Sequence, residues 1–142
     1  MGATMEFLCD RMRQSNRATI VRMENFVEEQ AVRKTLGPDL WKQLCHEFER
    51  EARCINEVQA DKILIQRTEI SLALTDSDSA KRLKLQYVDL LPGISIALAN
   101  ERGMITFRVN TSALAPSLTL MLNGQPFQPR DLVMDSMIRL TK

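Results

Sequence analysis

The sequence predicts an α+β fold in which two N-terminal helices and a short C-terminal helix accompany an antiparallel meander of four to five strands. Two observations predict it. Apolar residues recur at helical spacing up to about residue 60, and they alternate with polar residues from about residue 62 to residue 122. The links between the alternating segments are too short for parallel crossovers. Since each segment has one apolar side, we expect helix to cover one face of the sheet and leave the other open.

The first predicted helix spans residues 4–36 and carries an apolar stripe. The polar stretch QSNRA (14–18) leaves open whether this helix is continuous. GPD at 37–39 is expected to end it and to start a second helix, because proline lacks an N–H and is favoured at the first helical position. We therefore expect an N-terminal amphipathic helical arm at 1–36 and an α+β domain at 37–142, which together form one globular unit.

The second predicted helix runs to about Val58 and has a regular apolar stripe. That stripe consists of Trp41, Leu44, Cys45, Phe48, Ala52 and Ile55. The alternating segments are EISLALT (69–75), RLKLQYV (82–88), ISIALA (94–99), MITFRV (104–109) and LTLML (118–122), with KILIQ (62–66) as a further candidate. A closing helix is expected over about 129–140, with Pro129 at its first position.

Length, charge and cysteine usage indicate one soluble domain in a reducing compartment. The chain has 142 residues, 44% of them hydrophobic, and a formal net charge of +1. This balance gives no general bias toward nucleic acid or an anionic membrane. No apolar run is long enough to span a membrane, and no signal peptide is recognisable. The three cysteines form no C-x-x-C pair, so we expect reduced thiols and a cytoplasmic protein.

LCHEFEREARC (44–54) contains the only histidine and two of the three cysteines. At about 100° per residue, Cys45 falls on the apolar side of the helix, whereas His46 and Cys54 fall outside it. The three side chains are therefore expected to diverge, and a tetrahedral metal site needs three or four converging ligands. We predict no catalytic, cofactor-binding or metal-binding residue, here or elsewhere in the chain.

KRLK (81–84), together with Arg67 and Arg108, would form a basic stripe on the open face of the sheet. Such a stripe would suit phosphate or an acidic partner protein. Tyr87 and Phe107 are expected to face inward, which leaves no aromatic side chains on that face to stack on single-stranded bases. We therefore do not expect a nucleic-acid partner. TDSDSAK (75–81) departs from the calcium-loop pattern and reads as a turn.

Three function classes remain, and the preferred one is a non-catalytic protein-interaction or regulatory domain. In this reading the first helix carries apolar surface that the domain cannot cover, and it associates with a second copy, as a homodimer, or with another protein. The predicted association surface is Met5, Leu8, Met12, Met23, Phe26 and Val27.

The second class is a small-molecule-binding domain with an apolar pocket between the Trp41 helix and the sheet. The residues expected to line that pocket are Trp41, Phe48, Tyr87 and Phe107. The third class is an enzyme of unknown type, because no recognisable constellation of catalytic residues is present. The sequence does not identify the partner, the ligand or the oligomer number.

Overall fold

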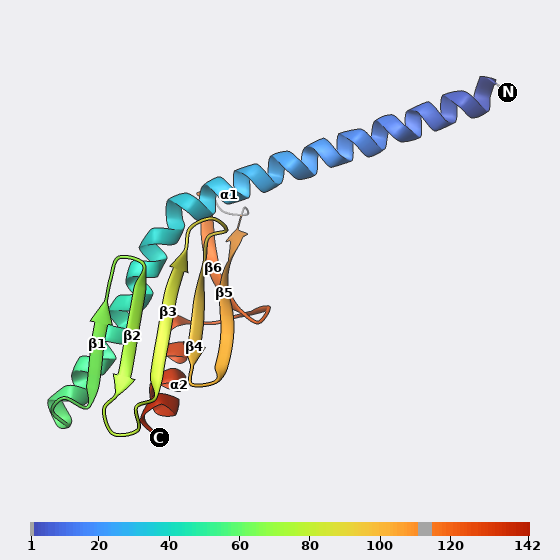
Figure 1. The fold of residues 1–142 in the computed structure, drawn as a ribbon. Helices are drawn as coiled ribbons and strands as arrows, with labels where there is room; N and C mark the ends of the chain where they lie inside the picture. Colours follow the sequence, from blue (N-terminus) through green and yellow to red (C-terminus); the bar gives the residue numbers. More distant parts are fainter. Residues whose placement is uncertain (1, 111–114) are drawn as a thin grey trace. The chain divides into compact units, whose positions relative to one another are not determined.

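The computed structural model describes residues 2–110 and 115–142, and it gives only the backbone for residues 2–11, 13–16 and 18–24. The elements, in chain order, are helix α1 (Gly2–Val58), strands β1 (Ile63–Arg67), β2 (Ser71–Asp76), β3 (Arg82–Val88), β4 (Gly93–Leu98), β5 (Glu101–Asn110), β6 (Ser117–Leu122) and β7 (Gln125–Pro126), and helix α2 (Pro129–Thr141) (Figure 1). The α+β class predicted from the sequence is confirmed.

The chain divides into two compact units, Met1–Ala31 and Val32–Lys142. The first unit is helical from Gly2 onward, and we call its residues 2–31 the arm. The second unit contains the rest of α1, the whole sheet and α2. Among the described residues, no helix has an apolar stretch that could cross a lipid bilayer.

The prediction of two N-terminal helices is wrong. Helix α1 continues without a break through both QSNRA (14–18) and GPD (37–39). Pro38 lies inside the helix, where it has no N–H for the carbonyl one turn earlier. This loss usually costs about 3 kcal/mol or more, which is why a proline was expected to end the helix.

Contacts with the sheet on both sides of Pro38 explain why the helix continues. Before the proline, Arg33 Nε donates a hydrogen bond to the carbonyl of Phe107 at 2.8 Å. After it, Trp41 Nε1 donates to the carbonyl of Glu69 at 2.8 Å. Both turns are therefore fixed to the sheet in a helical path, and tertiary contacts override the local preference of proline.

The sheet has seven strands in the part of the chain that the structure describes, and they follow one another in the order β1 to β7. Every neighbouring pair is antiparallel, so the predicted meander is confirmed. The predicted count of four to five strands is wrong. The segment at 62–66 forms β1, and the Asn-Gly turn at Asn123 and Gly124, with φ values of 52° and 79°, adds the two-residue strand β7.

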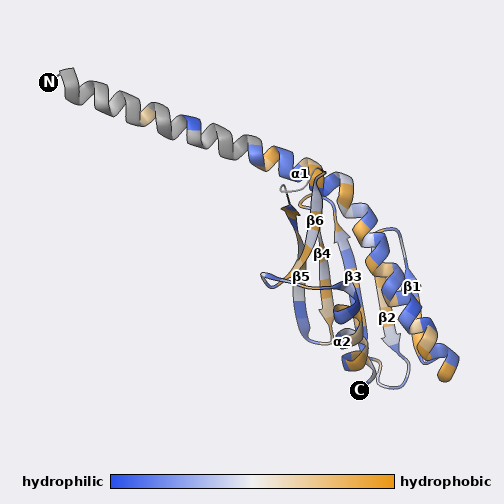
Figure 2. Cartoon of the chain, turned by 180° about the vertical axis from the view of Figure 1, so that it is seen from behind, coloured by the Kyte–Doolittle hydropathy of each residue, from blue (hydrophilic) through white to orange (hydrophobic). Residues whose placement is uncertain are grey.

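One face of the sheet holds the hydrophobic core. The strand register places Leu85 between Leu72 and Ile96 of its neighbours, so the apolar positions of adjacent strands form continuous rows. The part of α1 after Trp41 and the whole of α2 lie on this side of the sheet (Figure 2). We call this the covered face, and the opposite side the open face.

Candidate functional site

The helical stretch 44–54 behaves as predicted from its spacing. Cys45 is buried, whereas His46 and Cys54 are exposed. Burial raises the pKa of the Cys45 thiol from 9.0 to about 12. The thiol is therefore protonated at neutral pH and is a poor nucleophile. Among the described residues, no cluster of three or more His, Cys, Asp or Glu side chains is placed to hold a metal ion.

The four aromatic residues expected to line a pocket separate into two pairs. Trp41 and Tyr87 contact each other, with ring centroids 6.0 Å apart and planes inclined by 31°. Both line a surface hollow of about 730 Å³. Phe48 and Phe107 lie in the core and do not line that hollow. The hollow is formed by Pro38, Trp41, Lys42, Arg67, Thr68, Glu69, Ile70 and Tyr87.

The hydroxyl of Tyr87 lies close to Gly37 of helix α1. A Cβ atom at Gly37 would be 2.7 Å from this oxygen and 3.1 Å from the ring of Phe107. The hydroxyl is buried and has no hydrogen-bond partner among the described residues. Burial and, to a smaller extent, the charge of Asp89 raise the pKa of Tyr87. Gly37 therefore permits the close approach, and it does not end the helix as the sequence had suggested.

Arg67 belongs to the covered side of the sheet and not to the basic stripe proposed for the open face. Its register partner is Leu72, a core residue. The guanidinium donates from Nη1 to Glu49 Oε1 of α1 at 2.8 Å, and this hydrogen bond raises the pKa of Arg67. The other oxygen of Glu49 is 3.5 Å from Nη2 of Arg53. Arg67 therefore connects strand β1 to the helix above it.

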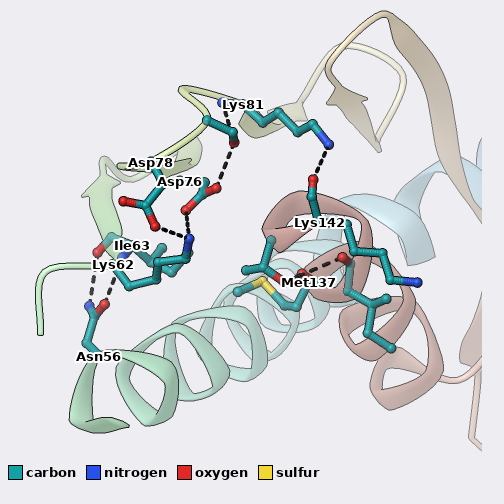
Figure 3. Close-up of polar contacts among 11 residues, drawn as sticks. Asn56, Lys62, Ile63, Asp76, Asp78, Lys81, Met137 and Lys142 are labelled. Atoms are coloured by element: carbon teal, nitrogen blue, oxygen red, sulfur yellow. Dashed lines mark hydrogen bonds and ion pairs between the residues drawn. The ribbon is translucent and has the colours of Figure 1, made fainter. Parts of the chain in front are cut away.

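The TDSDSAK turn is a second polar link. Lys62 Nζ lies 2.8 Å from Asp76 Oδ1 and 2.6 Å from Asp78 Oδ2, and Ser79 Oγ donates to Asp76 Oδ2 at 2.7 Å (Figure 3). The hydrogen bonds from Lys62 and Ser79 lower the pKa of Asp76 from 3.8 to about 2. The acidic turn is therefore occupied by the chain's own ammonium group, which explains why it does not need a cation.

Asn56 fixes the start of β1 to the end of helix α1. Its side-chain Nδ2 donates to the carbonyl of Ile63 at 2.9 Å, and the N–H of Ile63 donates to Oδ1 at 2.8 Å (Figure 3). The amide thus satisfies both backbone groups of one strand residue, as a neighbouring strand would. The sequence alone does not indicate this contact, because an asparagine near a helix end gives no local signal of its distant partner.

The open face of the sheet carries basic side chains and no acidic ones in its described strand positions. The basic residues are Arg82, Lys84, Arg102 and Arg108, and all four are exposed. The register aligns Lys84, Ala97 and Arg102 in one row across β3, β4 and β5. The row continues through Ala73 of β2. The sequence had suggested Arg82, Lys84 and Arg108 for this face, whereas Arg102 was missed because the strand predicted there begins only at residue 104, and β5 begins at Glu101.

The predicted association surface falls partly outside the described side chains. Met5, Leu8 and Met23 lie there, so the structure says nothing of their side chains. The other three members are described and strongly exposed: Met12 is 67%, Phe26 is 56% and Val27 is 66% exposed. Large apolar side chains are therefore in contact with solvent at two separate places along the arm.

Comparisons of the chain with protein-family models, with curated proteins and with solved structures found no significant match.

Proposed function

We propose that this chain is a non-catalytic interaction domain that self-associates through its arm. The exposure of Met12, Phe26 and Val27 carries the proposal. Burying apolar surface stabilises an assembly by about 25 cal/mol per Å², so side chains of this size favour association once they find a complementary surface. The covered face of the sheet offers no room for them, because residues from Trp41 onward in α1 and the residues of α2 already fill it.

The length of the arm supports the same proposal. A helix of its size, residues 2–31, would extend about 45 Å. Helices in water gain most of their stability from the packing of an apolar face, and propensity alone is marginal. A partner that covers Phe26 and Val27 would supply that packing. The partner that we propose is a second copy of the chain.

The environments of the perturbed titratable groups support a non-catalytic reading. Shifted pKa values often mark catalytic groups, but structural burial and ion pairing shift them too. Here burial accounts for Cys45, while ion pairs within the fold account for Lys62, Arg67 and Asp76. Cys45 lies in the core, Arg67 pairs with Glu49 of α1, and Lys62 and Asp76 pair with each other, so each group has a structural role.

Solution mass tests the proposal on the full chain. We expect the wild type to exceed its monomer mass of 16.2 kDa in light scattering, increasingly so at higher concentration. Replacing the two exposed apolar residues, as Phe26→Gln with Val27→Gln, should return the mass to the monomer value. The matched control, Asn25→Gln with Lys34→Gln, changes exposed polar positions of the same helix and should behave as the wild type.

Circular dichroism of each variant verifies that the helix persists. A wild type that stays monomeric at the highest concentration reached would overturn the proposal. It would also be overturned if the Phe26 and Val27 variant kept the mass of the wild type while the helix remained intact.

The hollow beside Trp41 supports a second candidate, a small-ligand site. Its specific observation is the Tyr87 hydroxyl, which is buried without a hydrogen-bond partner among the described residues, next to a hollow that Lys42 and Arg67 also line. An apolar molecule with an anionic group would match these walls. Because Trp41 is the only tryptophan, its fluorescence reports on this hollow alone.

Titration with 8-anilinonaphthalene-1-sulfonate tests this second candidate. Saturable quenching of Trp41 fluorescence, weakened by Ile70→Ser at the exposed rim, would support a ligand site. The control Ile138→Ser changes an exposed isoleucine on α2, which does not line the hollow, and should leave the titration unchanged. Absence of saturable quenching would remove this candidate.

A further inference from the structure

We propose that the arm of one copy docks on the open face of the sheet of a second copy, with Glu28 and its exposed apolar neighbours Phe26 and Val27 lying against the side chains of that face. The inference rests on the proposed function, since it names the surface that receives the arm. The occupant is a second copy of this chain, because the exposed carboxylate of Glu28 on the arm complements the exposed basic side chains of the open face.

The open face is an unneutralised positive surface on a chain that is almost neutral. The whole chain has a formal net charge of +1, with 19 basic and 18 acidic residues. Arg82, Lys84, Arg102 and Arg108 are all exposed, and none of them forms an ion pair within the part of the chain that the structure describes. On the covered side, by contrast, Arg67 already has a carboxylate partner, Glu49.

The register gives these charges a defined spacing. Lys84 and Arg102 lie in one row on either side of Ala97, two strand spacings or roughly 10 Å apart. Arg82 is two residues from Lys84 along β3, which is roughly 7 Å. The small side chain of Ala97 leaves a shallow floor between the two longer ones. A helix that carries an exposed carboxylate can therefore lie close to the sheet there.

Apolar contact accompanies the charges on both surfaces. On the open face, Met104 is exposed and lies two residues from Arg102 along β5. On the arm, the exposed residues Phe26 and Val27 immediately precede Glu28, which is also exposed. Each surface thus places an apolar side chain beside a charge, and the charges have opposite signs. Docking would cover the apolar groups and neutralise the bases in the same contact.

The chemistry of the open face favours a protein helix over nucleic acid. Single-stranded nucleic acids are bound by basic surfaces with exposed aromatic side chains, on which the bases stack. The two aromatic residues of the described strands, Tyr87 and Phe107, are both buried on the covered side. The open face presents basic side chains and the thioether of Met104. Such a surface matches the carboxylates and apolar side chains of a protein helix better than it matches nucleobases and sugars.

Reciprocal docking would close the assembly. If each arm lies on the other copy's sheet, both contacts are identical, and the product is a two-fold symmetric dimer. The expected mass is then twice the monomer's 16.2 kDa, without further growth at higher concentration.

Charge reversal in the full chain tests the inference. We expect Lys84→Glu with Arg102→Glu to raise the dimer Kd roughly tenfold or more, because attraction becomes repulsion at the centre of the contact. The matched control, Arg50→Glu with Arg130→Glu, reverses the same charge at exposed positions on the helices and should change the Kd less than about twofold. Glu28→Lys on the arm should weaken the homodimer as the face variant does.

Mixing the two variants provides the decisive measurement. We call Lys84→Glu with Arg102→Glu the face variant and Glu28→Lys the arm variant. In a mixed dimer, the unchanged arm of the face variant meets the unchanged open face of the arm variant. In the other contact, the arm is basic and the face is acidic, so the charges again have opposite signs. Each variant alone should be weak, and the equimolar mixture should regain a Kd near that of the wild type. If the mixture does not regain affinity, the inference is overturned.

Other outcomes separate this inference from the proposed function. If the wild type dimerises and the face variant dimerises equally well, the arm docks elsewhere, so the inference fails and the proposed function stands. If the wild type is a monomer, both fail. A monomeric chain that binds a short DNA duplex, and loses that binding in the face variant, would assign the open face to nucleic acid and overturn the inference.

Discussion

The covered face of the sheet and its open face are built from alternate residues of the same strands, but they treat charge in opposite ways. On the covered side, charged groups sit at the margin of the core and are paired, as Arg67 is with Glu49 and Lys62 with Asp76. On the open side, Lys84 and its basic neighbours stand in solvent without carboxylate partners among the described residues.

This difference shows that a nearly neutral composition can conceal a polarised surface. Acidic residues concentrate in the helices and turns, while the charged residues at the strand positions of the open side are all basic. The charges of the covered side therefore stabilise the fold through contacts within the chain. Exposed charges contribute little to folding stability, so in our proposal those of the open side are available for recognition.

The largest expected effect lies at the centre of the covered side. Phe48 is fully buried between α1 and the sheet, so Phe48→Ala should lower the free energy of unfolding by about 3–5 kcal/mol. The matched change on the open face, Met104→Ala, should cost less than about 1 kcal/mol. Urea unfolding followed by circular dichroism measures both. Equal costs for the two variants would contradict the division between the faces.

An intermediate effect is expected where the helix approaches the sheet. Gly37→Ala places a Cβ atom 2.7 Å from the hydroxyl oxygen of Tyr87 and should destabilise the protein by about 1–3 kcal/mol. An unstrained helix would instead gain about 1 kcal/mol from the same substitution.

A double-mutant cycle with Tyr87→Phe tests whether the Tyr87 hydroxyl is the group that the new Cβ atom of Gly37→Ala meets. Alone, Tyr87→Phe should leave stability unchanged or raise it, because the hydroxyl is buried without a partner among the described residues. Combined with Gly37→Ala, it should recover part of the loss, since the oxygen that the new Cβ meets is gone. Additive effects would show that the hydroxyl is not the obstacle.

The smallest expected effect depends on pH. The pKa of Asp76 is lowered in the folded chain from 3.8 to about 2, so its contribution to stability is present above pH 3.8 and is lost as the pH falls toward 2. Asp76→Asn should cost about 1–2 kcal/mol near neutral pH, the scale of a hydrogen bond to a charged group.

Unfolding curves of both proteins between neutral pH and about pH 2 measure this effect. The stability difference between them should shrink as Asp76 becomes protonated. A difference that stays constant down to that pH would rule out the ion pair with Lys62 as its origin. The variant Asp78→Asn is the control. The carboxylate of Asp78 is exposed, and it contacts the ammonium group of Lys62 from outside the core.

The strands could be predicted from the sequence because their signal is local. Alternation in RLKLQYV (82–88) reproduces the bounds of β3, since every second residue meets the core. The arrangement of the helices could not be predicted in the same way. The continuity of α1 through Pro38 depends on anchors from Arg33 and Trp41 to strands and loops far along the chain.

The same distinction applies to the candidate sites. Helical spacing correctly separated Cys45 from His46 and Cys54, because all three lie on one regular helix. It assigned Arg67 to the wrong environment, since the partner of Arg67 is a glutamate 18 residues earlier on another element. The sequence predicted Lys84 on the open face, but only the register between β4 and β5 places Arg102 in the same row.

The bond between Asn56 and Ile63 has a consequence for aggregation. A terminal strand normally presents unpaired N–H and C=O groups, which can recruit the strand of another molecule and extend the sheet. Asn56 occupies both groups of Ile63 at one border of the sheet. At the other border, β7 is only two residues long and ends in Pro126, which has no N–H to offer. Each border therefore has one point at which the addition of another strand is disfavoured.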